Sequence, residues 1–289
     1  MTDVMETANR PEFRAPPPLV QATARMGYNS GMNERPDRCL LCEARLSNPV
    51  CQMAGASLSR FSALTTVVSY HAGQKLFTQG DRAGTVFLVR TGQVKLTHAH
   101  VDGVAQVLRM AGPGETLGVG ASEDHEVNVS AVATLSTSVC RTRLPEIETL
   151  VRTDPEFALV WAHLLMDEIH RSREAILNLG PHPAIIRMAR FLLTASRDQI
   201  RTQSKKARRT SKAAPTWGPL VVRTTHSDLA SSLSIAQETA TRLLGTLEEA
   251  HVVKLLRGKI EILDLDRLAA VGGYPGSDVD LDRPEASSL

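Results

Sequence analysis

Four cysteines are the residues of this chain whose type and spacing could do chemistry. Three of them lie close together in the stretch CLLCEARLSNPVC, as Cys39, Cys42 and Cys51, and the fourth, Cys140, comes much later. Thiolates bind zinc ions and iron–sulfur clusters, and four of them complete a Cys₄ set. Zinc sites tend to pair one CxxC motif with a second, which this chain lacks, whereas irregular spacing is common for a cluster. The pattern leaves an iron–sulfur site, a zinc site and redox thiols open, and Cys140 taken alone also suits the core of a strand.

The bulk composition is that of an ordinary globular protein. The 289 residues are 42% hydrophobic and 22% charged, with a formal net charge of +2, so any surface that attracts nucleic acid must be local. The N-terminal stretch MTDVMETANRPEFRAPPP lacks the apolar segment of a signal peptide, and no run of about 18 apolar residues predicts a membrane span. We therefore expect the cytoplasm, where structural disulfides are rare. Because no catalytic triad, phosphate loop or acid–base pair stands out, we do not expect an enzyme.

The C-terminal part has the outline of a winged helix-turn-helix. It predicts a helix around Ser227–Leu233, a tight turn at Ser234–Ile235 and a second helix around Gln237–Ala250. The stretch VVKLLRGKIEIL that follows predicts a hairpin turned at Arg257–Gly258.

The second helix of this unit has two distinct faces. One carries Glu238, Thr241 and Arg242, and on a recognition helix this face would enter the major groove of DNA. Arginine suits paired hydrogen bonds to guanine, and glutamate accepts one from cytosine. The alternative is an ordinary surface ion pair between Glu238 and Arg242. The other face is apolar and should point to the domain core, with Ala240, Leu243, Leu244 and Leu247.

The middle of the chain predicts a sheet domain followed by a long helix. From about Leu58 to Leu150, short runs rich in Val, Leu and Thr alternate with glycines, which is typical of an antiparallel sandwich or barrel. From Pro155 the pattern is helical, with a seam spaced by three and four residues that suits lengthwise packing on another helix. The alternative is a helix lying on the sheet of its own domain. The seam consists of Ala158, Ala162, Leu165, Ile169, Ser172, Ile176 and Leu179.

A further helix is expected around Ala184–Arg197, and a strongly basic run follows it. Residues 201–212 hold six positive charges and no acid. Such a run is usually a solvated loop, although it could also contact phosphate.

On these motifs the chain resembles the Crp/Fnr superfamily of transcription regulators, over about residues 36–272. The stretch YHAGQKLFTQGDRAGTVFLVRTGQVKL resembles the family's cyclic-nucleotide-binding-type β-roll, and GETLGVGA resembles its next glycine motif. TSVCRTRLP resembles the region that carries a fourth cluster cysteine, and QETATRLLGTLEE resembles the recognition helix. The resemblance is strongest to the Fnr branch.

The resemblance to the Fnr branch implies a metal cluster. In that branch, three N-terminal cysteines and one in the β-roll hold an oxygen-labile [4Fe–4S] cluster, and the four cysteines of this chain fall on those positions. The gap of eight residues between Cys42 and Cys51 is longer than the five of the best-known Fnr pattern and nearer the seven of other cluster-bearing relatives. This departure, in a loop that contains Pro49, bears on cluster stability and oxygen sensitivity more than on ligation.

The resemblance also implies a DNA half-site. The family pattern Glu-x-x-Ser-Arg falls on Glu238, Thr241 and Arg242, with Thr in place of Ser. Because the hydroxyl is kept, we expect a TTGAT-like half-site in a palindrome such as TTGAT-N4-ATCAA. The neighbouring Gln237 and Thr239 are expected to contact DNA as well.

Two further expectations concern the long helix and the β-roll. The dimerisation residues are expected to be Leu165, Ile169, Ser172, Ile176 and Leu179. Related oxygen sensors can carry a carboxylate at the position of Ser172, so a neutral serine should repel a second chain less. Nucleotide-binding members use an Arg-Ser pair to hold the cyclic phosphate, and this chain has Val129-Ser130 there. A buried phosphate would lack its charge-assisted bonds, so we expect no binding of cyclic AMP.

The sequence thus predicts an α+β chain with a β-roll (a double-stranded jelly-roll), a long dimerisation helix and a C-terminal winged helix-turn-helix. We expect a cytoplasmic, homodimeric transcription regulator with one [4Fe–4S] cluster per chain, acting on palindromic promoter DNA and RNA polymerase. The alternative keeps the fold but senses through redox thiols, zinc, or haem held by His71 or His98. A regulatory module of an effector enzyme is disfavoured, since the helix-turn-helix leaves no catalytic region. The expected parts are a disordered 1–35, a cluster segment 36–56, the β-roll 57–153, the dimerisation helix 154–182, the winged helix-turn-helix 183–272 and a flexible tail 273–289.

Overall fold

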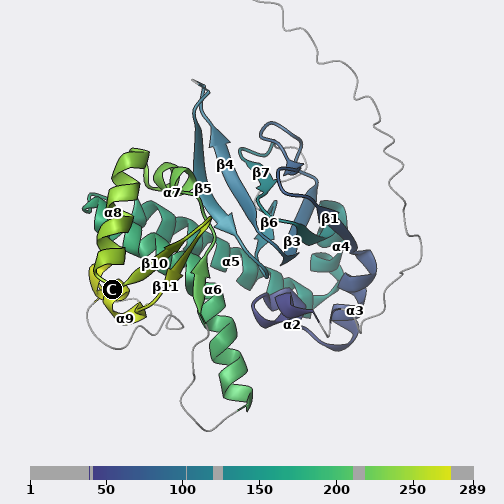
Figure 1. Cartoon of the computed structure of the whole chain (residues 1–289). Helices are drawn as coiled ribbons and strands as arrows, with labels where there is room; N and C mark the ends of the chain where they lie inside the picture. The colour runs from purple at the N-terminus through teal and green to yellow at the C-terminus, as the bar shows by residue number, and fades with distance from the viewer. Residues whose placement is uncertain (1–38, 40–41, 102, 120–125, 211–218, 275–289) are drawn as a thin grey trace, which may run out of the picture. The chain divides into compact units, whose positions relative to one another are not determined.

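The computed structural model describes residues 39, 42–101, 103–119, 126–210 and 219–274 (Figure 1). These residues belong to one unit of the chain, Glu34–Leu289. The segments expected to be disordered, 1–35 and 273–289, lie outside the described residues except for Gly273 and Tyr274. No helix in the described ranges combines the length and apolarity needed to cross a membrane.

The β-roll consists of two four-stranded antiparallel sheets, with strand orders β1-β8-β3-β6 and β2-β7-β4-β5. One core cluster takes Phe87 and Val89 from the first sheet and Val94 and Leu96 from the second, so it fills the space between them. The predicted sheet domain is therefore confirmed as a sandwich. The strands are β1 (Thr66–Tyr70), β2 (Lys75–Phe77), β3 (Thr85–Thr91), β4 (Val94–Ala99), β5 (Ala105–Ala111), β6 (Thr116–Leu117), β7 (Ser130–Ala133) and β8 (Thr137–Arg143).

The turn between β3 and β4 shows why glycine punctuates this region. Gly92 has a φ of +89°, and a Cβ atom there would lie 2.6 Å from the Cα of Thr137. Only glycine meets both demands without strain.

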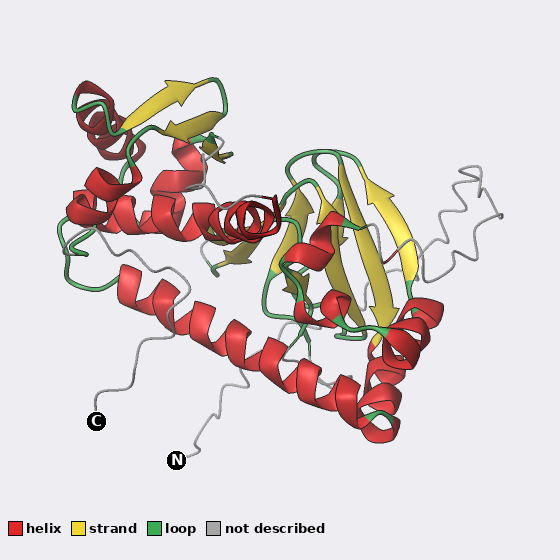
Figure 2. Ribbon diagram, turned by 90° about the horizontal axis from the view of Figure 1, so that it is seen from below, coloured by secondary structure: helices red, strands yellow, loops and turns green. Residues whose placement is uncertain are grey.

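Helices flank the sandwich rather than entering it (Figure 2). The bounds are η1 (Glu43–Leu46), α2 (Pro49–Gln52), α3 (Gly55–Leu64), α4 (Leu144–Thr153) and α5 (Pro155–Asn178). The prediction of strands from Leu58 to Leu150 is wrong at both ends of this range, because the first residues belong to α3 and the last to α4. Each of these short helices buries one side, Leu58 and Phe61 from α3 and Ile147 and Leu150 from α4, in a second core outside the sheets. Tertiary packing thus overrides the local pattern.

Helix α6 runs from Ala184 to Thr210 and is much longer than the expected Ala184–Arg197. The prediction that the basic run begins as a loop is wrong, because the helix continues through residue 210; residues 211–218 lie outside the description. No glycine or proline interrupts the sequence between Pro183 and Pro215, and Lys and Arg are good helix formers.

The C-terminal domain has the predicted winged helix-turn-helix fold. Its core joins α6 to two further helices and a three-stranded sheet of order β10-β11-β9. The turn between the two helices uses Ser234 in the left-handed region, with a φ of 52°. The elements are β9 (Leu220–Val222), α7 (His226–Leu233), α8 (Gln237–Glu249), β10 (Val253–Leu256), β11 (Lys259–Ile262) and α9 (Leu265–Val271), of which α9 was not predicted.

Candidate sensor and DNA-binding sites

The four cysteines gather on the outer face of the sheet that contains β3 and β8. Cys140 pairs with Leu88 across the strands, while its neighbour Val139 points into the core between the sheets. Cys140 therefore lies in a strand but faces away from that core. Cys51, which is 7% exposed, and Leu88 form a small apolar cluster with Ala44, and Cys42 and Cys140 pack against it.

None of the four cysteines forms a disulfide, and they are spaced more widely than a single metal ion requires. Cys39 donates from Sγ to the Oγ atom of Ser62 on α3, at 3.4 Å. Among the described residues, no three His, Cys, Asp or Glu side chains stand close enough together to hold one metal ion. A zinc ion needs each sulfur at about 2.3 Å from the metal. An iron–sulfur cluster is larger, so its four sulfur ligands lie further apart.

Electrostatics show that the four sulfurs share one environment. Burial raises the pKa of the Cys51 thiol well above its ordinary value, and the nearby Cys140, Cys42 and Cys39 raise it further, while Arg90 acts in the opposite direction. Four thiolates here would repel one another in a site of low polarity. A group that binds them must therefore bring positive charge.

Arg90 is the cation placed at this site. Its half-buried side chain makes a hydrogen bond with the side chain of Cys42. Burial alone would lower the pKa of the guanidinium, but this bond and the charges of Cys42, Cys140 and Cys39 raise the pKa overall.

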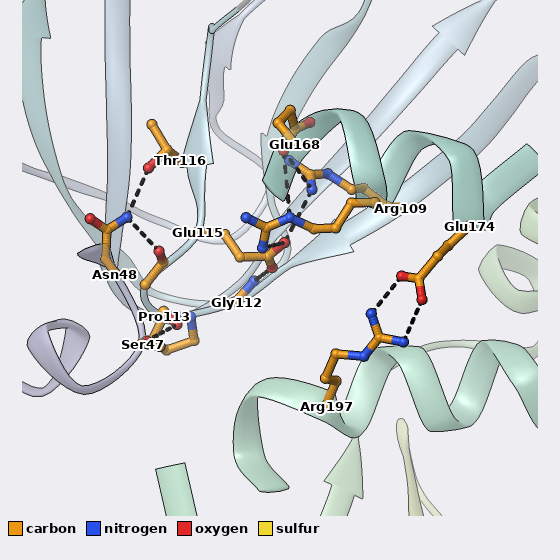
Figure 3. A network of polar contacts seen from close by, with 12 residues as sticks. Ser47, Asn48, Arg109, Gly112, Pro113, Glu115, Thr116, Glu168, Glu174 and Arg197 are labelled. Atoms are coloured by element: carbon orange, nitrogen blue, oxygen red, sulfur yellow. Dashed lines mark hydrogen bonds and ion pairs between the residues drawn. The ribbon is translucent and has the colours of Figure 1, made fainter. Parts of the chain in front are cut away.

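Asn48 fixes the short helix that carries Cys51. The amide is 2% exposed; its Oδ1 accepts from the backbone N–H groups of Val50 and Cys51, at 3.0 and 3.3 Å. Its Nδ2 donates to the carbonyl of Gly114 at 2.8 Å and to Oγ1 of Thr116 at 3.0 Å (Figure 3). One buried side chain therefore caps α2 and ties it to the loop between β5 and β6.

The same loop reaches helix α5 through Glu115. The carboxylate of Glu115 lies 3.2 Å from Arg109 and 3.6 Å from Arg171, and both arginines also contact Glu168 (Figure 3). Further along α5, Glu174 forms a two-bond ion pair with Arg197 of α6, with one N–O distance of 2.6 Å. Polar contacts thus run from the Cys51 helix to α5 and from α5 to the DNA-binding domain.

A cavity of about 840 Å³ lies beside these residues, between the β-roll, α5 and the C-terminal domain. Val129 lines it at the position where nucleotide-binding relatives would need arginine. Ser130 accepts a hydrogen bond from the backbone N–H of Gln79, at 3.0 Å, and Glu115 is held by the two arginines. At the Val129 position no guanidinium is available for a cyclic phosphate, although arginines line other parts of the cavity, among them Arg109, Arg171 and Arg223.

Helix α5 presents an apolar stripe to solvent. Ile169 is 52% exposed and Ile176 is 70% exposed, while Ser172 satisfies its hydroxyl on the carbonyl of Glu168 at 2.9 Å. On another face of α5, Phe157 and Leu164 are buried against the N-terminal helices. The helix therefore packs on its own domain with one face and leaves the predicted seam largely uncovered.

Helix α8 holds the predicted DNA-reading residues at the surface. Gln237, Glu238, Thr241 and Arg242 are exposed, Thr239 is half-buried, and the apolar face with Ala240 and Leu244 is buried. The ion pair between Glu238 and Arg242 that served as the alternative is not formed in the described structure. The hydroxyl of Thr241 is 3.1 Å from Nδ1 of His226, a residue at the start of α7.

The other helix of the motif packs on the β-roll. Lys95 of β4 forms an ion pair of 2.6 Å with Asp228, and the backbone N–H of Val107 on β5 donates to Oγ of Ser231 at 2.9 Å. These contacts hold α7 and leave the reading face of α8 free.

Comparison with known proteins assigns the family. The sequence matches the cyclic nucleotide-binding domain family over residues 67–154 and the Crp-like helix-turn-helix domain family over residues 186–271. It is 31% identical over 197 residues to the cyclic AMP receptor protein of Thermus thermophilus, covering 67% of this chain and 82% of that protein. The chain belongs to the Crp/Fnr family of transcription regulators.

A further relative and a solved structure are similar to most of this chain. The nitrogen fixation regulation protein FixK of Bradyrhizobium diazoefficiens is 26% identical over 81% of this chain and 93% of its own length. The structure of FixK2 from Bradyrhizobium japonicum has a TM-score of 0.58 at 23% identity, covering 72% of this chain and 96% of that one. As a Crp/Fnr regulator, the chain is a DNA-binding protein of the helix-turn-helix type and not an enzyme.

Sequence reasoning missed four polar residues of these sites: Arg90, Asn48, Glu115 and His226. Only Asn48 had a local signal, since an asparagine directly before Pro49 is a typical start of a helix. The partners of the others lie far away in the sequence.

Proposed function

We propose that the four cysteines hold a [4Fe–4S] cluster and that the chain is an oxygen- or redox-responsive member of the Crp/Fnr family. The observation that carries this proposal is the set of four cysteines on one sheet face, outside any disulfide and in an apolar setting, next to the helix that packs on α5. When bound, the cluster would supply sensitivity to oxidants and the positive charge that four close thiolates require.

The residues beside Cys51 offer a direct route from the sensor to α5. Val50 is 1% exposed and belongs, with Met53, to the core that also contains Phe157 and Leu164 of α5. Holding Cys51 in place keeps these two side chains under α5. Without ligation of Cys51, the segment keeps its apolar contacts, the Asn48 bonds and the bond from Ser47 to the Pro113 carbonyl, but it loses one attachment, so its grip on α5 weakens.

Helix α5 is proposed to pair with α5 of a second copy. Its uncovered seam, with Leu165, Ile169, Ser172, Ile176 and Leu179, has the 3.5-residue period of a helix-helix contact. Pairing would place two α8 helices about one DNA turn apart, as a palindrome of the form TTGAT-N4-ATCAA requires. Glu238, Thr241 and Arg242 are proposed to read the bases, with Gln237 and Thr239 beside them. RNA polymerase is the proposed partner at the promoter.

The cavity beside Glu115 is proposed not to bind cyclic AMP. Val129 supplies no charge for the phosphate, and Glu115 is engaged by Arg109 and Arg171. Calorimetry with micromolar nucleotide is expected to give no saturable heat.

The alternative sensors keep the same fold. Zinc would need the thiols to move closer together. Haem would need a histidine at a cavity, but His71 is exposed and His98 holds the carbonyl of Asn128 at 2.7 Å. Thiol oxidation is compatible with four cysteines that form no disulfide and is the second candidate.

Anaerobic purification tests the cluster. We expect a brown protein with an absorption band near ~400–420 nm and roughly four iron and four sulfide per chain, which bleaches in air. Cys51→Ser should lose most of the iron, whereas Ser57→Ala, a buried residue on the neighbouring helix, should keep it. A colourless wild-type protein that still binds DNA would refute the proposed cluster, but it would not refute the role as a regulator.

Binding to a TTGAT-N4-ATCAA duplex tests the output. We expect the anaerobic dimer to bind it more tightly than a scrambled duplex, and the air-treated protein to lose this preference together with the dimer. Equal binding of both duplexes under anaerobic conditions would refute the proposed half-site.

A further inference from the structure

The placement of Arg90 in the sheet is unusual. On β3, Phe87 and Val89 point into the sandwich core, and Val86 and Leu88 point outward. The pairing of β3 with β8 shifts by one residue between Val89 and Thr91, so Arg90 is the extra residue of a β-bulge. Because side chains alternate along a strand and Val89 points inward, Arg90 points to the outer face, where Leu88 meets the cysteines. The bulge places Thr91 opposite Ser138.

The contacts of Arg90 converge on the sulfur atoms. Its side chain makes a hydrogen bond with Cys42 and lies within electrostatic range of Cys39 and Cys140, and it also acts on Cys51. A guanidinium is always charged, and half-burial at this position costs solvation. The cost is offset only if negative charge stands opposite, as four thiolates would provide.

We propose that Arg90 is a positioning residue of the cysteine site, which holds the Cys42 thiolate and stabilises the more negative, reduced form of a bound cluster. This inference rests on the proposed function. A cubane held by four thiolates carries net negative charge, and reduction adds one electron. The reduction potential of such a group depends on its net charge and on hydrogen bonds to its sulfurs. A cation bonded to one of those sulfurs therefore raises the potential.

The size of the effect follows from Coulomb's law. A guanidinium that bonds a ligand sulfur would act on the charge of a bound cluster, and an effective dielectric of about 20 describes a partly buried site. Removing this charge should shift the reduction equilibrium by roughly tenfold or more toward the oxidised form.

The test compares Arg90→Gln, Arg90→Lys and Arg141→Gln with the wild type, all purified anaerobically. Arg141 is the matched control. It follows Cys140 in the sequence, but its side chain is exposed. It lies opposite Phe87 in the sheet, and its charge lowers the pKa of Tyr70. Each protein is titrated with reductant while the cluster absorption and the iron content are followed. We expect a lower midpoint potential for Arg90→Gln, a value between that and wild type for Arg90→Lys, and a wild-type value for Arg141→Gln.

Three outcomes overturn the inference. If Arg90→Gln has a full iron content and a wild-type potential, Arg90 does not have the proposed role, while the proposed cluster is unaffected. The same shift in Arg141→Gln would show a general charge effect rather than a role for Arg90. If the wild-type protein contains no iron, the proposed function is refuted, and the inference about Arg90 is refuted with it. If Arg90→Gln fails to fold, as judged by circular dichroism, the Arg90→Lys potential decides.

Discussion

Replacement of Asn48 by alanine should release the segment that carries Cys51. The mutation removes a helix cap, worth about 1 kcal/mol, and two buried donor bonds to Gly114 and Thr116, worth about 1 kcal/mol each. The sum is roughly 3 kcal/mol against local opening of the segment, or about a hundredfold in the opening equilibrium. The sandwich core does not include Asn48, so most of the loss should be local rather than global.

Hydrogen exchange followed by mass spectrometry measures this directly. Backbone amides of 42–53 should exchange about a hundredfold faster in Asn48→Ala, and amides at the start of α5 should lose part of their protection because Val50 and Met53 cover them. Asn48→Asp retains the cap oxygen but buries a carboxylate oxygen against the Gly114 carbonyl, so it should release the segment at least as much as Asn48→Ala. Asn128→Ala, at an exposed position, is the control. Wild-type exchange of 42–53 in Asn48→Ala would refute the idea that this side chain holds the segment with Cys51.

The remaining predictions concern the dimer, the DNA and acid. Ser172→Asp should weaken the anaerobic dimer relative to Ser172→Asn, because two carboxylates would repel each other across the proposed seam. Sedimentation equilibrium measures this, and equal dissociation constants for the two variants would refute the idea that a neutral residue at this position favours the dimer. Arg242→Ala should cost about 1–3 kcal/mol of discrimination between specific and scrambled duplexes in fluorescence anisotropy. Neutralising residues 201–212 should flatten the plot of log affinity against log salt by about 0.9 for each phosphate that the protein no longer neutralises, and an unchanged slope would make the run a plain extension of α6. The pKa of Asp154 lies below its ordinary 3.8, since hydrogen bonds from Phe157 and Ser57 and the charge of Arg60 outweigh burial. It therefore stabilises the fold above pH 3.8, and this contribution is lost as the pH falls through its folded pKa; Asp154→Asn should remove that acid dependence from denaturant titrations.

The sequence predicted elements where the signal was local. The two helices of the C-terminal motif, the turn at Ser234 and the hairpin at Arg257–Gly258 each depend on neighbours within a few residues, and they fold as expected. The extension of α6 was missed although no breaker stands before Pro215, because a run of like charges was given more weight than helix propensity.

The geometry of the site depends on contacts that no local pattern reveals. That Cys140 faces outward follows from its pairing with Leu88, and a shift of one residue would have turned it into the core. Asn48 meets its partners 66 and 68 residues away. Arg90 shares this outer face because it follows the inward-facing Val89, but the cysteines that meet it there come from β8 and from the N-terminal segment, which are far away in the sequence.

Helix α5 is held at two points along its length, and this bears on how a change at the cysteines reaches the DNA. Phe157 and Leu164 are held by the apolar core under α2, while Glu168 and Arg171 are held by the charges around Glu115. At 100° per residue these four positions share one face of the helix, and the seam with Ile169 lies about a quarter turn away. Fixing the first face therefore fixes the direction in which the seam points. Because Asn48 ties α2 to the Glu115 loop, loosening the Cys51 segment weakens both attachments together. We expect the helix then to rotate more freely, so that the two seams of the proposed dimer lose their alignment without any change in the seam itself.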